Sequence, residues 1–89
     1  MIWNHRVIFH REKPARNSYF AVHECHYDEP GDTIPHSWTE NPISMIEDSV
    51  DDMRVTATRI RHACLKPVLE IKRNKLVVYS AKKTKGEQA

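Results

Sequence analysis

The residues best suited to chemistry in this chain are concentrated in one short segment, His23-Glu24-Cys25-His26. The chain holds six His and two Cys in 89 residues, and imidazole, thiolate and carboxylate groups are the ligands that zinc prefers. In an extended strand, His23 and Cys25 project from one face while Glu24 and His26 project from the other. A metal site would therefore need a ligand from a neighbouring strand, either His5 or His36.

Cys25 could instead act as a nucleophile beside a histidine base. His23 lies two residues away on the same face of the strand, which is about 7 Å and too far for a hydrogen bond. The dyad would need His5 or His36 from across the sheet. We expect a buried structural thiol at Cys25, no catalytic residue, no metal and no other cofactor, and keep His23, Cys25 and His36 as the metal-ligand candidates to check.

The charges of the chain are divided between separate stretches, although the net charge is only +2. No Lys or Arg occurs between residues 24 and 53, a stretch with nine acids: Glu24, Asp28, Glu29, Asp32, Glu40, Glu47, Asp48, Asp51 and Asp52. From residue 66 onward there are seven basic residues and two acidic ones. A dipolar molecule of this kind favours partners of complementary charge, but the pattern does not name them.

The basic residues near the C-terminus are the candidate site for an anionic polymer such as RNA or DNA. Tyr79 lies among them and has a ring that could stack on a base. The predicted binding residues are Lys72, Arg73, Lys75, Tyr79, Lys82, Lys83 and Lys85. The alternative is a solvated tail, and the chain has no helix-turn-helix, RNA-recognition or KH signature to decide between the two.

Alternation of apolar and polar residues predicts three strands ahead of a helix. They are expected at residues 2–12, 19–28 and 34–41. Turn residues around Pro14 and at Pro30-Gly31 separate them. In the second strand, the face expected to point inward carries Tyr19, Ala21, His23, Cys25 and Tyr27. Pro35 cannot donate a ladder hydrogen bond, which places the third strand at a sheet edge.

The pattern over residues 50–66 predicts a helix. Ser49 is the expected N-cap, with Asp52 three residues later in a variant of the capping box, and Pro67 ends the helix. Apolar residues at steps of three and four predict one core-facing side: Val50, Met53, Ala57, Ile60 and Cys64. We therefore expect Cys64 to be a buried thiol as well.

Together these elements predict an α+β fold, with a three-stranded antiparallel meander in the order 1-2-3 packed on one helix (β-β-β-α). Residues 68–79 add either a second hairpin or one returning strand. We expect a folded domain over 1–71 and a basic extension over 72–89 that is disordered at least from residue 80. One helix covers one sheet face, so the other face would be open to a partner. The apolar residues expected on the open face are Ile2, Ile8, Phe20 and Val22.

Four segments carry a resemblance to a known family. They are Trp-Asn-His-Arg-Val-Ile at 3–8, Tyr-Phe-Ala-Val-His-Glu-Cys-His-Tyr-Asp at 19–28, Trp-Thr-Glu-Asn-Pro at 38–42 and Glu-Asp-Ser-Val-Asp-Asp-Met at 47–53. In this order they resemble a family of small, functionally uncharacterised bacterial proteins with a W-N-x-R-V strand, an I-H-E-x-x-Y-D strand and a W-T-x-x-P segment. The resemblance implies no activity, and this chain departs from it at Cys25-His26 and past Ile71.

We expect the function to be binding rather than catalysis. No apolar run approaches the roughly 18 residues of a membrane helix, and the first residues do not have the pattern of a signal peptide, so we expect a cytoplasmic protein with reduced thiols and no membrane partner. The first hypothesis is a non-enzymatic protein-binding or adaptor module that contacts a partner protein or a second copy through the sheet or the acidic stretch. The alternative is a nucleic-acid-associated protein using the basic helix end and C-terminal tail.

Overall fold

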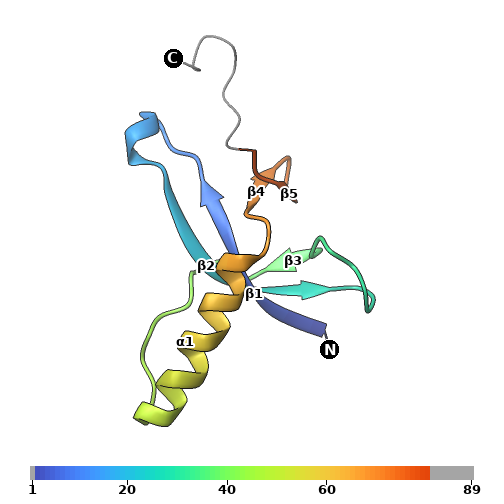
Figure 1. The fold of residues 1–89 in the computed structure, drawn as a ribbon. Helices are drawn as coiled ribbons and strands as arrows, with labels where there is room; N and C mark the ends of the chain where they lie inside the picture. The colour runs from blue at the N-terminus through green and yellow to red at the C-terminus, as the bar shows by residue number, and fades with distance from the viewer. Residues whose placement is uncertain (1, 81–89) are drawn as a thin grey trace.

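The computed structural model describes residues 2–80. Its elements in chain order are β1 (Ile2–His10), the 3-10 helix η1 (Ala15–Asn17), β2 (Tyr19–Tyr27), β3 (Ser37–Trp38), α1 (Val50–Leu65), β4 (Leu69–Lys72) and β5 (Lys75–Val78) (Figure 1). The five strands form one mixed sheet in the order β3-β2-β1-β4-β5. The predicted α+β class is confirmed, and β1 is the central strand.

The sheet retains the predicted 1-2-3 order of the first three strands but is larger than the predicted meander. β4 pairs in parallel with β1, placing Leu69 opposite Ile8, and β5 pairs antiparallel with β4. Residues 68–79 therefore contain a hairpin, whose turn residues Arg73 and Asn74 have φ of 53° and 65°, as two-residue hairpin turns require. The sheet reaches Val78, beyond the predicted domain end at residue 71.

The third strand is much shorter than the predicted range 34–41. Only Ser37 and Trp38 pair with β2, at the sheet edge. Pro35 precedes them and is buried. Because its ring fixes φ and its nitrogen has no hydrogen to donate, pairing cannot extend through it. The predicted edge position is confirmed, while the predicted length is wrong.

The register of β1 and β2 corrects the predicted open face. It places Phe20 opposite Phe9 and Val22 opposite Val7, on the opposite face of the sheet from Ile8. Ile8 is fully buried. The helix covers the face of Trp3, since the Arg59 guanidinium lies 5.5 Å from the centre of the Trp3 ring. We call this the helix face; it carries Trp3, His5, Val7 and Phe9, and the far face carries Asn4, Arg6 and Ile8.

The hydrophobic core lies on the far face, where the central strands meet. Its buried residues are Ile8, Cys25, Leu69 and Leu76, with Trp38 and Ile71 packed against them. The predicted inward face of β2 is confirmed for His23, Cys25 and Tyr27, all of which are buried. It is wrong for Tyr19, which is 46% exposed because it lies near the tip of the β1–β2 hairpin, beyond the core.

Helix α1 starts as predicted but packs differently. The Ser49 hydroxyl accepts a hydrogen bond of 3.0 Å from the Asp52 backbone N–H, which confirms the N-cap. Of the sixteen residues of α1, all of them described, Ala63 alone is buried. Val50 and Cys64, predicted to face the core, are not buried. For Val50 the reason is that the first turns of α1 project past the end of the sheet (Figure 1). Cys64 lies in the last turn and is exposed because the helix turns the side of Ala63 toward the sheet.

Because the core is small, we expect a large loss of stability from truncating Ile8. Ile8→Ala should lower the free energy of unfolding by about 3 kcal/mol, the usual cost of removing a buried Ile side chain. Leu65 is 74% exposed, so the comparison change Leu65→Ala should stay within about 0.5 kcal/mol of the parent. Urea unfolding measures both, and equal losses would contradict the assignment of the core.

Candidate functional site

Two hairpin tips rich in basic residues lie at the same end of the sheet. The parallel pairing of β1 with β4 sends both strands toward this end, where the β1–β2 and β4–β5 turns follow them (Figure 1). We call this region the basic end; its exposed residues are Arg11, Lys13, Arg16, Lys72, Arg73 and Lys75. The structure thus adds three basic residues from the first hairpin to those predicted near the C-terminus.

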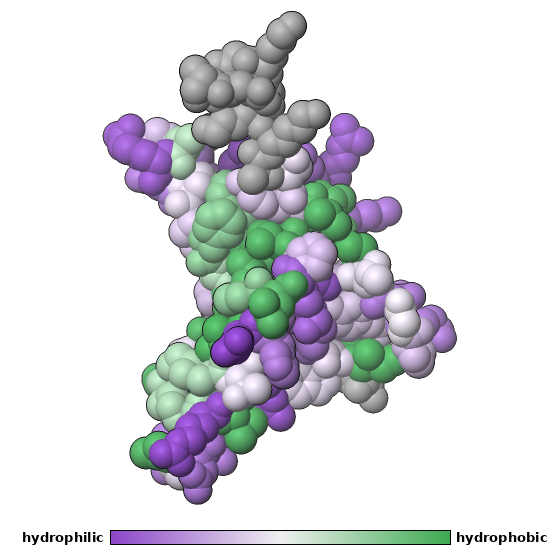
Figure 2. Space-filling view, viewed as in Figure 1, coloured by the Kyte–Doolittle hydropathy of each residue, from purple (hydrophilic) through white to green (hydrophobic). Residues whose placement is uncertain are grey.

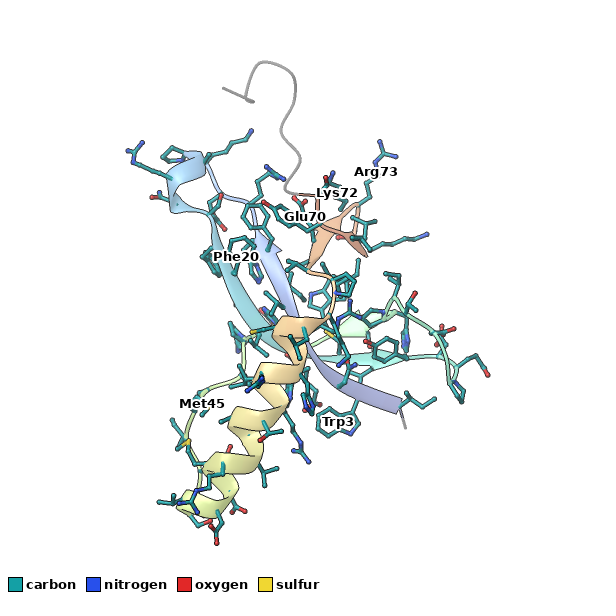
Figure 3. The ribbon with its side chains drawn as sticks, viewed as in Figure 1. Trp3, Phe20, Met45, Glu70, Lys72 and Arg73 are labelled. Atoms are coloured by element: carbon teal, nitrogen blue, oxygen red, sulfur yellow. The ribbon has the colours of Figure 1, made fainter. Side chains whose placement is uncertain are left out.

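The predicted nucleic-acid residues are only partly brought together. Lys72 and Arg73 point outward from the β4–β5 tip (Figure 3), and Lys75 is paired with Lys72 across the hairpin. Tyr79 instead packs its ring on Phe9, with 4.5 Å between ring centres, and on Phe20, at 5.7 Å. It belongs to an aromatic group on the helix face. Lys82, Lys83 and Lys85 lie outside the described residues.

One acid at the basic end is held in an ion pair. The Arg11 Nε donates to the Glu70 carboxylate at 2.8 Å, and the Arg11 guanidinium also lies 5.1 Å from the centre of the Phe9 ring. The Glu70 side chain is almost fully buried. The hydrogen bond from Arg11 holds the pKa of this carboxyl below its ordinary value, so Glu70 is ionised at neutral pH.

The opposite end of the molecule is acidic. The first turns of α1 and the segment before them carry Glu47, Asp48, Asp51 and Asp52, all exposed. Apolar side chains are exposed among these acids, and Met45 lies beside α1 in Figure 3. We call this region the helix surface; its exposed apolar residues are Met45, Ile46, Val50 and Val55. The charge division of the sequence thus becomes a separation along a molecule 47 Å long.

The three metal-ligand candidates are not brought together. His23 and Cys25 are buried, whereas His36 is exposed and its Nδ1 lies 3.1 Å from the Asp28 carboxylate. His23 Nδ1 lies 2.8 Å from the Thr39 carbonyl oxygen and must donate to it, because a carbonyl only accepts. Among residues 2–80, no three His, Cys, Asp or Glu side chains are arranged to hold a metal ion.

The two thiols lie in opposite environments. Burial raises the pKa of Cys25 to about 11, so its thiol stays protonated at neutral pH and is a poor nucleophile. The prediction of a buried thiol is confirmed for Cys25. It is wrong for Cys64, which is exposed on α1, because the helix turns a different side toward the sheet.

A pair of histidines was missed by reasoning from the sequence. His10 Nε2 lies 2.9 Å from His23 Nε2, and the His10 ring stacks on Tyr19 with 4.7 Å between centres. Since His23 donates through Nδ1, its neutral form accepts at Nε2 and His10 donates. Burial, and then the nearby His23, lower the pKa of His10. Only the strand register, which the sequence pattern does not fix, identifies this pair.

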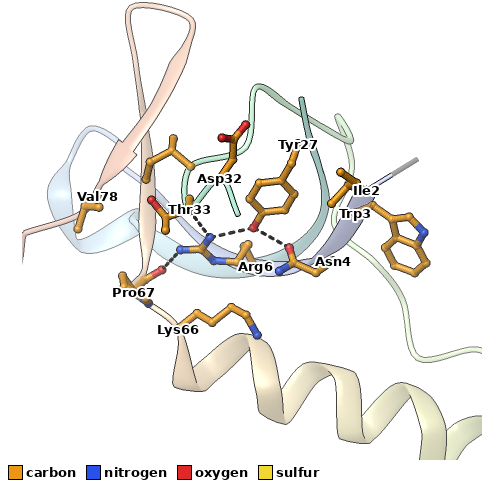
Figure 4. A pocket seen from close by; sticks show the side chains of 11 residues that line it. Ile2, Trp3, Asn4, Arg6, Tyr27, Asp32, Thr33, Lys66, Pro67 and Val78 are labelled. Atoms are coloured by element: carbon orange, nitrogen blue, oxygen red, sulfur yellow. Dashed lines mark hydrogen bonds between the residues drawn. The ribbon is translucent and has the colours of Figure 1, made fainter. Parts of the chain in front are cut away.

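Arg6 is one of the residues that line a cavity of about 390 Å³ (Figure 4). The residue is 3% exposed. Its Nη1 donates to the Tyr27 hydroxyl and to the Thr33 carbonyl, both at 2.9 Å, and its Nη2 donates to the Pro67 carbonyl at 2.8 Å. The Tyr27 hydroxyl in turn donates to Asn4 Oδ1 at 2.8 Å. Arg6 was visible in the sequence only as part of the W-N-x-R-V segment.

Comparison with protein-family models, with curated proteins and with solved structures gives no match for this chain. The resemblance to a small bacterial family therefore stays a prediction.

Within residues 2–80, no helix has the length and apolar character needed to cross a bilayer.

The contrast between the thiols predicts two rates of labelling. Cys64 should react with Ellman's reagent at the rate of an open thiol, and Cys25 at least about a hundredfold more slowly, since it is both buried and protonated. The release of thionitrobenzoate in native buffer should correspond to one thiol, and in denaturant to two. Cys64→Ser should remove the fast phase, and a fast phase that persists in this variant would refute the assignment.

The Arg11–Glu70 pair predicts a pH-dependent contribution to stability. Because the folded pKa of Glu70 lies below its ordinary value of 4.5, ionised Glu70 stabilises the fold above that value, and the contribution is lost as the pH falls through the folded pKa. Urea unfolding at pH 7 and at pH 3 should show a smaller difference in Glu70→Gln than in the parent. The exposed change Glu40→Gln is the control, and an equal pH effect in both variants would contradict the pairing.

Proposed function

We propose that this chain is a non-enzymatic protein-binding module and that its partner is a second copy of itself. The observation that carries the proposal is that α1, a helix of sixteen residues, buries only Ala63. Helices in small domains are stabilised mainly by packing of an apolar face. Because α1 packs so little within its own chain, its exposed side is available for contact with another protein.

The exposed side of α1 has the composition of a protein interface. Val50 is 67% exposed, and Ile46, just before the helix, is 82% exposed. Apolar residues gather in the middle of the visible face of the molecule and again along the helix (Figure 2). Acidic residues surround the exposed apolar residues of the helix surface. Apolar patches with a polar rim are typical of sites of protein contact.

The complementary surface is present on the same chain. The basic end carries exposed Lys72 and Lys75, and beside them the aromatic group of Phe9, Phe20 and Tyr79 leaves Phe20 56% exposed. Phe20 pairs with Phe9, so this group lies on the helix face, the same side of the sheet as α1. A basic-rimmed apolar patch is what the acidic-rimmed helix surface should bind.

In an antiparallel dimer, both the helix surface and the basic end of each copy are in contact with the other copy. The helix surface of each copy then faces the basic end of the other, and the same contact is made twice about a two-fold axis. Such isologous contacts close on themselves and are the commonest form of homo-oligomer. Opposite charges at both ends favour this orientation over the parallel one, in which like charges would meet.

The test uses two charge-reversal variants, each of which should weaken dimerisation alone, while a mixture of the two should dimerise. In sedimentation velocity at low salt the parent should be a dimer, while Asp48→Lys and the double variant Lys72→Glu/Lys75→Glu should each associate at least about tenfold more weakly, since like charges then meet at the interface. Mixing the two variants should restore a heterodimer, because the lysine introduced in one then faces the glutamates introduced in the other. Glu29→Lys, outside the helix surface, is the matched control and should remain dimeric.

Several outcomes would refute self-association. A monomeric parent at about 100 μM would do so, given that standard interfaces hold well below that concentration. So would a mixture of the two variants that stays monomeric although each is folded by circular dichroism. A monomeric parent that binds single-stranded RNA or DNA, in a manner weakened by salt and by Lys72→Glu/Lys75→Glu, would replace the proposal with the nucleic-acid function.

A further inference from the structure

The cavity beside Arg6 contains a buried cation without an anionic partner. None of the three groups that accept from Arg6 is charged: they are the Tyr27 hydroxyl and the carbonyls of Thr33 and Pro67. Its Nε has no hydrogen-bond partner. Among residues 2–80, no carboxylate lies within ion-pair distance of its guanidinium. A buried charge normally has a counterion, because leaving water is costly for an unpaired ion.

The neighbouring acidic groups do not supply that charge. Cys25 lies close enough for the guanidinium to favour its thiolate, yet burial still raises the pKa of Cys25 to about 11, so the thiol is neutral. Asp32 lines the cavity, but its Oδ2 accepts a hydrogen bond from the Glu29 backbone N–H within the turn and it forms no ion pair with Arg6. Among residues 2–80 the guanidinium therefore has no ion-paired counterion, and the cavity beside it can accept an anion from outside.

The walls of the cavity define what that anion should be. Four segments form them: β1, β2 with the loop that follows it, the residues after α1, and β5. Apolar surface comes from Ile2, Ile34, Pro67 and Val78, and Lys66 adds a second cation (Figure 4). The amide oxygen of Asn4 accepts from Tyr27, which leaves its NH₂ group as a donor. The volume of about 390 Å³ is in the usual range for small-molecule sites.

We infer that this cavity binds a small carboxylate with an apolar body, its oxygens against Arg6, Asn4 and Lys66 and its body against Ile2, Ile34 and Val78. Guanidinium groups bind carboxylates with strong, charge-assisted hydrogen bonds. The apolar walls favour a carboxylate carrying a hydrocarbon group over a bare inorganic anion. The same chemistry is offered by a free organic acid and by the C-terminal residue of a peptide. This site is separate from the helix surface, so it stands or falls independently of self-association.

The experiment is an NMR titration of the full ¹⁵N-labelled chain with four probes: sodium hexanoate, hexanamide, inorganic phosphate and N-acetyl-Ala-Leu with a free C-terminus. Hexanoate should give saturable shifts at residues lining the cavity. Hexanamide, which has the same body without the charge, should bind at least about tenfold more weakly, a difference of about 1.4 kcal/mol. Tighter binding of the peptide than of hexanoate would identify a chain terminus as the source of the carboxylate, and the reverse would identify a free acid.

Two variants of β5 provide a matched control. Val78 lines the cavity, so Val78→Trp should fill it and abolish hexanoate binding. Val77, its neighbour, projects from the other face of the strand and does not line the cavity, so Val77→Trp should bind as the parent does. Lys66→Gln, an exposed change, should weaken binding several-fold through loss of a nearby cation. Arg6→Gln would remove the guanidinium itself. Because Arg6 also makes three internal hydrogen bonds, this change alters the fold as well as the site, so the other variants are the cleaner test.

The inference is overturned if hexanamide binds as tightly as hexanoate, if phosphate binds as tightly at the same residues, or if no probe saturates. It is equally overturned if Val78→Trp and Val77→Trp bind hexanoate alike while both remain folded.

Discussion

The buried guanidinium of Arg6 joins segments that are far apart in the chain. Its three hydrogen bonds reach residues 21, 27 and 61 positions away, so one side chain fixes β2, the loop after β2 and the segment after α1 to the central strand. Burying a cation is unfavourable unless its donors are satisfied. The carbonyls of Thr33 and Pro67 accept from Arg6 only when the loop and the helix end are in place, so this contact depends on the position of both segments relative to the central strand.

The small core has a second consequence. Ile8, Cys25, Leu69 and Leu76 pack together on the far face. On the helix face, Ala63 is the one buried residue of α1, and Arg59 lies over the Trp3 ring. A domain of this size buries only a modest share of its surface, and its stability is correspondingly limited. Under the proposed self-association, a second copy would supply the packing that other small domains obtain inside one chain, and stability would then be linked to association.

Local signals in the sequence predicted local structure well. The start of α1 at Ser49, the β1–β2 hairpin and the edge position forced by Pro35 depend on neighbouring residues. The parallel pairing of Ile8 with Leu69 joins residues far apart in the chain and has no local signal. The partners of Arg6, which lie 21, 27 and 61 positions away, have no local signal either. The side of α1 that faces the sheet was mispredicted because apolar periodicity identifies an apolar stripe, not whether the chain itself covers it. The basic residues near the C-terminus were recognised, but their neighbours Arg11, Lys13 and Arg16 required the topology.

The segment after α1 connects the helix to the cavity beside Arg6. Lys66 caps the end of the helix and also lines the cavity, while the next carbonyl, that of Pro67, accepts from Arg6. A force that shifts the C-terminal end of α1 must therefore either carry Pro67 with it or break a hydrogen bond to a buried cation. Breaking it is the costly choice, because the guanidinium would lose one of the few acceptors it has. If a partner binds α1 on the helix face as proposed, it would therefore also act on the wall of the cavity, and a carboxylate bound at Arg6 would act on the position of the helix.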